Sequence, residues 1–151
     1  MAAMRSAGDY AISCRVRAMA ATLSAKGHAV YTYYFAHAPV YSENYEHIEY
    51  LGAFHGAEVP FVFGDAFELK TDGERALARA MGCYWRNFAH TADPSNGPCD
   101  KSEQPTSWPR FKASTGAHEA TMVFDATETM VSVVVEDDLL KPKCEALLGS
   151  R

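Results

Sequence analysis

The segment from His28 to Phe35 limits the folds open to this chain more than any other. It is rich in aromatic and β-branched residues and alternates little with polar residues. This pattern is typical of a central strand that is covered on both faces of its sheet. Such a strand needs neighbouring strands, and the rest of the chain supplies few. We therefore predict an α/β or α+β protein in which these 151 residues form only part of a larger domain.

The segment from about Asp9 to Lys26 has the apolar periodicity of a helix. Its apolar residues recur at intervals of four, three and four, so they share one stripe of that helix. The residues of this stripe are Ile12, Val16, Met19 and Leu23.

A second helix is predicted from Thr71 onward, because Thr71 and Glu74 have the spacing of a capping box. The aromatic residues that follow recur at helical spacing, which favours core packing over a ligand-binding cluster. The expected buried face consists of Leu77, Met81, Tyr84, Trp85 and Phe88.

The remaining elements are predicted near the end of the chain. Two short runs, Thr121 to Asp125 and Met130 to Val135, have strand composition. The acidic residues Glu136 to Asp138 are expected to begin a terminal helix that reaches Leu148. Residues 36–54 have the composition of a long loop, and long ordered loops tend to carry function.

Charge and composition argue against several functions. The chain has 14 Lys and Arg against 19 Asp and Glu, so a basic surface for nucleic acid is not expected. No apolar run approaches the roughly 18 residues of a membrane-spanning helix. His37, His47 and His55 are separated by ten and eight residues, which matches no helical or zinc-binding spacing. We therefore expect no membrane span, no metal and no cofactor.

The segment Gly52-Ala-Phe-His-Gly-Ala-Glu58, followed by Val59-Pro-Phe-Val-Phe-Gly64, resembles the histidine loop of type-B carboxylesterases and cholinesterases. Further matching segments occur in the family's order and at similar separations, and together they cover most of the chain. These segments are Asp9 to Cys14, Val30 to His37, Tyr84 to Ala89, Asp93-Pro94, Trp108-Pro109 and Met122 to Asp125. Because each motif alone arises often by chance, the specificity of the resemblance comes from their common order.

The resemblance implies a fold and a domain organisation. Residues 1–151 would form the C-terminal segment of a carboxylesterase type-B domain, which has the α/β-hydrolase fold. That fold is a mixed, mostly parallel sheet flanked by helices, and it would be incomplete here. The nucleophile-bearing N-terminal part would be absent, and this chain would pair with it.

The resemblance also assigns roles to individual residues. His55 matches the catalytic histidine of the family, and Phe54 and Leu51 would line the substrate pocket beside it. Cys14 and Cys144 match a disulfide, which would imply secretion or passage through the secretory pathway. In a reducing compartment these two residues would remain separate buried thiols.

Two other positions bear on the resemblance. Cys83 and Cys99 have no assigned partner. Ala57 occupies the position where cholinesterases usually place an aromatic residue that helps to line the choline site. We therefore expect a general carboxylesterase rather than a cholinesterase.

In ester hydrolysis, the histidine takes a proton from the serine hydroxyl and returns it to the leaving alcohol. The resemblance places the serine on a G-x-S-x-G turn, and it places both the serine and the acid before the histidine in chain order. Neither the serine nor the acid lies within residues 1–151. Glu58 is too close to His55 in sequence to be the family's acid, and we expect it to hold the loop in shape.

We therefore expect the isolated chain to be inactive and the complete enzyme to hydrolyse a small-molecule carboxylic ester. One alternative is a non-catalytic cholinesterase-like protein that serves in adhesion or partner binding. A second alternative is a truncated gene product with no independent function.

Overall fold

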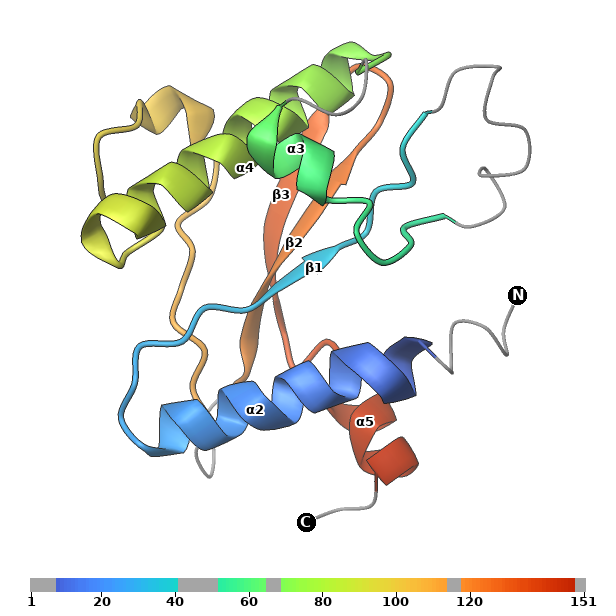
Figure 1. The fold of residues 1–151 in the computed structure, drawn as a ribbon, viewed down its shortest axis with the longest axis vertical. Helices are drawn as coiled ribbons and strands as arrows, with labels where there is room; N and C mark the ends of the chain where they lie inside the picture. The colour runs from blue at the N-terminus through green and yellow to red at the C-terminus, as the bar shows by residue number, and fades with distance from the viewer. Residues whose placement is uncertain (1–7, 41–51, 65–68, 114–117, 149–151) are drawn as a thin grey trace. The chain divides into compact units, whose positions relative to one another are not determined.

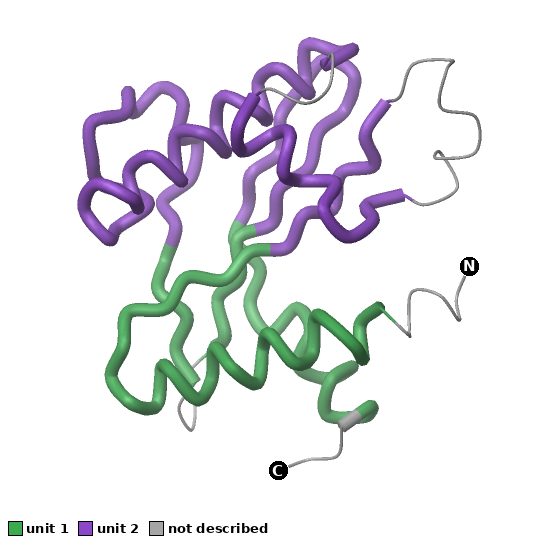
Figure 2. The backbone as a smooth tube through the Cα atoms, in the orientation of Figure 1, with its two compact units in different colours: residues 1–33, 109–122, 135–151 green, residues 34–108, 123–134 purple. Residues whose placement is uncertain are grey.

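The computed structural model describes residues 8–40, 52–64, 69–113 and 118–148. Two compact units are formed, one from residues 1–33, 109–122 and 135–151 and the other from residues 34–108 and 123–134 (Figure 2). We call them the first and the second unit. In chain order, the elements are η1 (Asp9–Ser13), α2 (Cys14–Ala25), β1 (Tyr33–Phe35), α3 (Val59–Phe63), α4 (Asp72–Thr91), η3 (Lys101–Glu103), β2 (Ala120–Ala126), β3 (Val131–Asp137) and α5 (Lys141–Leu148) (Figure 1).

The three strands form one sheet in the order β1-β2-β3. Met122 N donates a hydrogen bond to Thr32 O, and Ala36 N donates one to Phe124 O. The bonded positions advance in the same direction along both segments, so β1 and β2 are parallel. β2 and β3 are consecutive antiparallel strands, and a backbone hydrogen bond closes the turn between them. The sheet is therefore mixed, as predicted.

The strand predicted at 28–35 is shorter in the structure. Only Tyr33–Phe35 form β1, and these residues are exposed or half-buried. Within the described part of the chain, β1 is an edge strand of the sheet. The predicted extent of the strand is therefore wrong, whereas its central position in a larger sheet stays a prediction, because the further neighbours it requires are not among the described strands. Aromatic and β-branched composition indicates an extended backbone, but it does not say which segments cover it.

The predicted helix at the start of the chain is confirmed as η1 and α2, but its apolar stripe is not buried. Ile12, Val16, Met19 and Leu23 are 38–59% exposed in the structure. The buried residues of α2 are Cys14 and Ala20 instead. Periodicity therefore identified the helix correctly, while the face that this unit covers is a different one.

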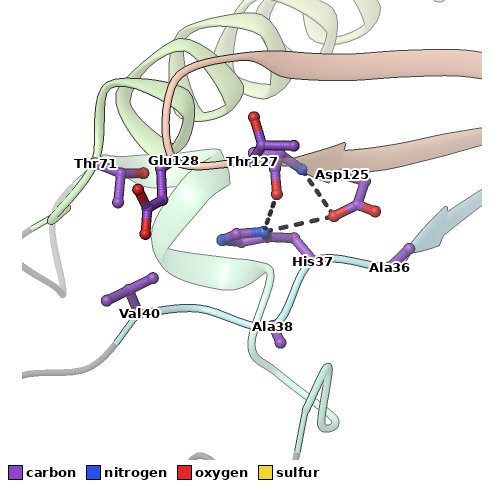
Figure 3. A pocket seen from close by; sticks show the side chains of 9 residues that line it. Ala36, His37, Ala38, Val40, Thr71, Asp125, Thr127 and Glu128 are labelled. Atoms are coloured by element: carbon purple, nitrogen blue, oxygen red, sulfur yellow. Dashed lines mark hydrogen bonds and ion pairs between the residues drawn. The ribbon is translucent and has the colours of Figure 1, made fainter.

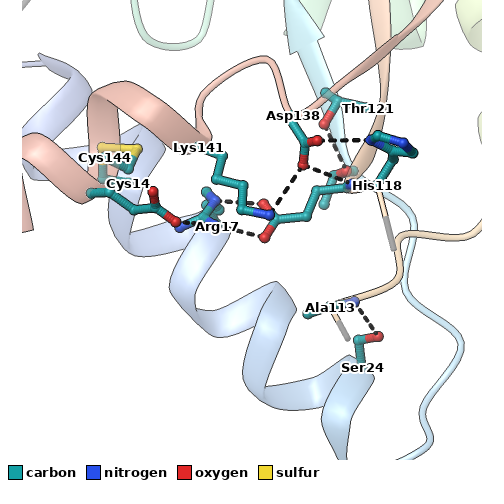
Figure 4. A network of polar contacts seen from close by, with 12 residues as sticks. Cys14, Arg17, Ser24, Ala113, His118, Thr121, Asp138, Lys141 and Cys144 are labelled. Carbon is teal, nitrogen blue, oxygen red and sulfur yellow. Dashed lines mark hydrogen bonds and ion pairs between the residues drawn. A yellow bond between two sulfur atoms is a disulfide. The ribbon is translucent and has the colours of Figure 1, made fainter. Parts of the chain in front are cut away.

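A disulfide and a set of polar contacts hold the first unit together (Figure 4). Cys14 of α2 is joined to Cys144 of α5 by a disulfide. Arg17 Nε and Nη2 donate to the two carboxylate oxygens of Glu119 at 2.5 and 2.6 Å. This bidentate geometry is the strong form of a charged hydrogen bond. It ties α2 to the segment that enters β2.

Asp138 lies at the turn between β3 and α5, where it has a left-handed φ of 57°. Its Oδ1 accepts a hydrogen bond from Glu119 N, and its Oδ2 lies 2.9 Å from His118 Nδ1. The hydrogen bond with Asp138 raises the pKa of His118, and the same bond lowers the pKa of Asp138. The expected helix start at Glu136 is wrong, because β3 continues to Asp137 and α5 begins at Lys141.

The second unit is built on α4, whose capping box is confirmed. Thr71 Oγ1 accepts a hydrogen bond from Glu74 N at 3.0 Å, and a Glu74 carboxylate oxygen accepts one from Thr71 N at 3.2 Å. Leu77, Met81 and Tyr84 are buried on this helix as predicted.

The end of α4 differs from the prediction. Phe88 is 47% exposed, and Asn87 is fully buried in its place. The Asn87 side chain donates to Pro94 O and accepts from Cys99 N, so it fixes the loop that follows the helix. A disulfide between Cys83 and Cys99 fastens the same loop to α4. Position 87 of α4 is therefore occupied by a buried polar side chain that holds the loop after the helix.

An aromatic cluster forms the core beside α4. The Trp108 ring lies 5.6 Å from the Tyr84 ring and 5.4 Å from the Phe124 ring, both in edge-to-face arrangements. Trp85 contacts the rings of Trp108 and Phe124 in the same cluster. Burial raises the pKa of the Tyr84 hydroxyl. β2 is thus anchored to α4 through large buried rings.

We expect Thr71→Ala to lower the free energy of unfolding by about 1 kcal/mol, because Glu74 N loses its side-chain acceptor. Urea unfolding followed by circular dichroism would measure this. Thr22→Ala is the matched control, since Thr22 Oγ1 only donates to Ala18 O within an exposed helical turn. A change for Thr71→Ala no larger than that for Thr22→Ala would contradict the capping role.

Candidate active site

His55 lies on a tight loop between two glycines with left-handed backbones. Gly52 has φ 61° and Gly56 has φ 90°, which side chains other than glycine rarely adopt. Phe54 N donates to Gly52 O and Ala57 N donates to Phe54 O, both at 3.0 Å. The chain therefore reverses on both sides of His55, whose side chain is exposed.

The short helix α3 follows this loop directly and anchors it. The backbone oxygen of Glu58 accepts from Phe61 N and Val62 N at the start of α3. Phe61 is 1% exposed, and α3 packs against α4. The ring of Phe61 lies 5.2 Å from that of Phe35 in β1. Thus the exposed histidine stands on a loop that ends in a buried anchor.

A buried acid–base pair lies next to this anchor, and the sequence did not indicate it. His37 is 5% exposed and Glu74 is 1% exposed. His37 Nε2 lies 3.1 Å from Glu74 Oε1. Its Nδ1 lies 3.2 Å from Ala126 O and 3.5 Å from Asp125 Oδ1. The ring of His37 therefore joins the end of β2 to the first turn of α4.

The Glu74 carboxylate accepts three backbone hydrogen bonds besides the contact with His37. The donors are Val40 N at 2.7 Å, Lys70 N at 2.8 Å and Thr71 N at 3.2 Å. Burial alone would raise the pKa of Glu74, but the hydrogen bonds, that from Val40 N foremost, lower it below its ordinary value. The carboxylate therefore stabilises the fold above its unfolded pKa, and this contribution is lost as the pH falls through the folded pKa.

A cavity of about 360 Å³ adjoins His37 at the carboxyl ends of β1 and β2. His37 and Asp125 point toward one another on its wall (Figure 3). The cavity is lined by Ala36, His37, Ala38, Val40, Thr71, Asp125, Ala126, Thr127 and Glu128. Its lining includes neither His55 nor Phe54.

The predicted site residues are only partly within the structure. Leu51 and His47 lie outside the described residues. Phe54 is half-buried beside the exposed His55. Among the residues that the structure describes, the His55 side chain makes no hydrogen bond or ion pair.

Metal-binding clusters and membrane-spanning helices are both absent from the described residues. Over residues 8–40, 52–64, 69–113 and 118–148, no group of three or more His, Cys, Asp or Glu side chains could hold a metal ion. In the same ranges, no helix is both long and apolar enough to cross a membrane.

The mixed three-stranded sheet and the helices around it form part of an α/β-hydrolase fold, the fold of the solved carboxylesterases to which this chain is similar. The model of the carboxylesterase family matches residues 1–146. The chain therefore belongs to the carboxylesterase family, which confirms the resemblance found in the sequence.

Curated relatives include acetylcholinesterases. Acetylcholinesterase 1 of Caenorhabditis briggsae and that of Caenorhabditis elegans are each 36% identical over 110 residues, covering 70% of this chain. Acetylcholinesterase of Bungarus fasciatus is 36% identical over 111 residues, or 71% of this chain. This chain spans about 17% of the length of each of these relatives.

Solved structures give the same result for the fold. The crystal structure of the Geobacillus stearothermophilus carboxylesterase at pH 6.8 superposes with a TM-score of 0.59 at 27% identity. The structure of that enzyme at pH 6.2 gives 0.60 at 29% identity. Both comparisons cover 85% of this chain, and they cover 24% and 23% of the carboxylesterase.

Proposed function

We propose that this chain supplies the general-base histidine, His55, of a serine carboxylic ester hydrolase. The serine oxygen attacks the ester carbonyl, and His55 takes the serine proton. His55 then gives that proton to the departing alcohol and leaves an acyl-serine. Water hydrolyses the acyl-serine with His55 again acting as the base. The observation that carries this proposal is an exposed imidazole on a glycine-flanked loop that ends in the buried anchor Phe61.

In this proposal, residues 1–151 are the C-terminal segment of the hydrolase domain. The serine, the acid and the oxyanion hole come from parts of the domain outside this chain, with which this chain pairs, and β1 is an edge strand of the described sheet. The chain alone is accordingly inactive. The disulfide between Cys14 and Cys144 favours an oxidising compartment, as in secreted proteins.

The substrate is proposed to be a small carboxylic ester. In this proposal Phe54 contacts the ester beside His55, and the same role predicted for Leu51 concerns a residue outside the described part of the chain. Ala57 is small and fully buried, so it offers no aromatic face to a quaternary ammonium group. This favours a general carboxylesterase over a cholinesterase.

The decisive experiment begins with the full transcript, read upstream of the Met1 codon for a G-x-S-x-G turn and a later acidic loop. The encoded protein is then assayed with p-nitrophenyl acetate before and after treatment with an organophosphate, which modifies an activated serine. We expect both motifs, and hydrolysis that the organophosphate abolishes. An open reading frame without the serine turn, and a protein without hydrolysis, would overturn the proposal and favour a binding protein.

A further inference from the structure

We propose that the buried pair of Glu74 and His37 is a clamp that positions the loop carrying His55. The proposal rests on the function proposed above for His55. Neither residue touches the reacting atoms, so both are positioning residues rather than catalytic ones.

The segment from Val40 to Lys70 carries His55 between β1 and α4, and we call it the excursion. The carboxylate of Glu74 binds the backbone at both ends of this excursion. The chain leaves the sheet after β1 and passes Val40, and it returns at Lys70 to enter α4. Val40 N donates to Glu74 Oε1 at 2.7 Å, and Lys70 N donates to Glu74 Oε2 at 2.8 Å. One buried side chain therefore fixes where this excursion begins and where it ends.

The ring of His37 links the same carboxylate to the excursion itself. The Phe61 ring lies 5.5 Å from it in an edge-to-face contact, and Phe61 belongs to α3, which directly follows the histidine loop. The opposite nitrogen of His37 lies 3.2 Å from Ala126 O at the end of β2. The clamp therefore connects the exit, the return, the anchor helix and the sheet.

Local contacts do not explain this arrangement. A capping box needs only the contact between Glu74 and Thr71 N, and an exposed glutamate provides it. Here Glu74 is 1% exposed, and its carboxylate also binds His37 Nε2 and Val40 N, which the capping box does not require. Burying a charge is unfavourable unless it is fully hydrogen-bonded, so the site is one in which every partner matters.

Glu74→Gln is the sharpest test, because it preserves the shape and removes one acceptor oxygen. The amide nitrogen is a donor, and it would face backbone N–H donors at either Val40 or Lys70. Whichever orientation the amide takes, one end of the excursion is released. A shift of about 1 Å in a catalytic group is enough to reduce turnover by about 100-fold.

The experiment uses the full-length enzyme and p-nitrophenyl acetate. Active sites are counted by stoichiometric titration with an organophosphate, so that turnover is expressed per folded site. We expect Glu74→Gln to lower kcat per titrated site by about 10- to 100-fold, with KM nearly unchanged. Thr71→Ala is the control, because it removes the other half of the capping box and leaves the carboxylate in place. We expect its kcat per site to stay within about twofold of the wild type.

His37→Gln provides a second variant, and we expect it to lower kcat per site in the same direction as Glu74→Gln. Fewer titratable sites with normal turnover at each remaining site would overturn the clamp, because that result signifies a structural role only. Complete loss of titratable sites in both variants would overturn it for the same reason. Equal losses of kcat in Glu74→Gln and Thr71→Ala would also overturn it. An unaltered rate in His55→Ala would instead refute the proposed function, so the two failures are distinguishable.

Discussion

Replacing His55 by alanine in the full-length enzyme is expected to lower kcat for ester hydrolysis by about 10⁴-fold or more, with little change in stability. The rate falls because the serine hydroxyl loses the base that takes its proton, and the other members of such a site cannot act without it. Stability changes little because the His55 side chain is exposed and forms no hydrogen bond or ion pair with the residues that the structure describes. Steady-state kinetics and a thermal melt measure the two effects.

The control for this experiment is His90→Ala, which removes another exposed histidine, in the last turn of α4. We expect its kcat to match that of the wild type. A His55→Ala enzyme that retains more than about a tenth of the wild-type rate would exclude His55 as the general base, since removal of a true catalytic histidine has far larger effects. That result would also remove the basis for the clamp.

The sequence predicts well those features that depend on only a few neighbouring residues. The capping box of Thr71 and Glu74 requires only a spacing of three, and it is present. The runs at Thr121 and Met130 became β2 and β3 because strand composition is also a local signal. The extent of β3 was less predictable, since Asp137 and its neighbours are exposed, and charged residues are tolerated there.

The contacts between distant segments could not be predicted in this way. His37 and Glu74 are 37 residues apart, and nothing near either residue marks the other as its partner. The sequence marks Glu74 only as part of a capping box, and it marks His37 only as one of three spaced histidines and as the end of a matching segment. The burial of Asn87 in place of Phe88 has a similar origin, because the loop that Asn87 holds is fixed by its fold and not by the periodicity of α4.

The histidine loop was recognised because it resembles a family, and not because of its chemistry. Taken alone, His55 is one of six histidines and would be regarded as an ordinary loop residue. The structure adds the geometry of the loop, with left-handed glycines at positions 52 and 56. It also adds what lies behind that loop, namely Phe61 packed on His37. Family resemblance thus located the candidate base, and packing indicates what holds it in place.

The second large effect is expected on stability. The double variant Cys14→Ala with Cys144→Ala should lower the free energy of unfolding by up to about 5 kcal/mol, because this disulfide closes a loop with a sequence separation of 130. Alanine is chosen because both cysteines are at most 1% exposed and a serine would bury a hydroxyl. Guanidinium unfolding of the oxidised protein measures the difference. The comparison requires that variant and wild type have the same slope of unfolding free energy against denaturant concentration.

The matched control is Cys83→Ala with Cys99→Ala, which opens a disulfide with a sequence separation of 16. In the chain-entropy model, this shorter loop contributes about 3 kcal/mol, roughly 2 kcal/mol less than the longer one. Both pairs are buried, so the loss of packed sulfur is similar in the two variants and the difference isolates loop length. Equal losses of stability in the two double variants would contradict the chain-entropy model. The disulfides would then not stabilise the protein by restricting the unfolded chain. Their effect would then lie in the folded state, where Cys83 and Cys99 fasten α4 to the loop that Asn87 also holds.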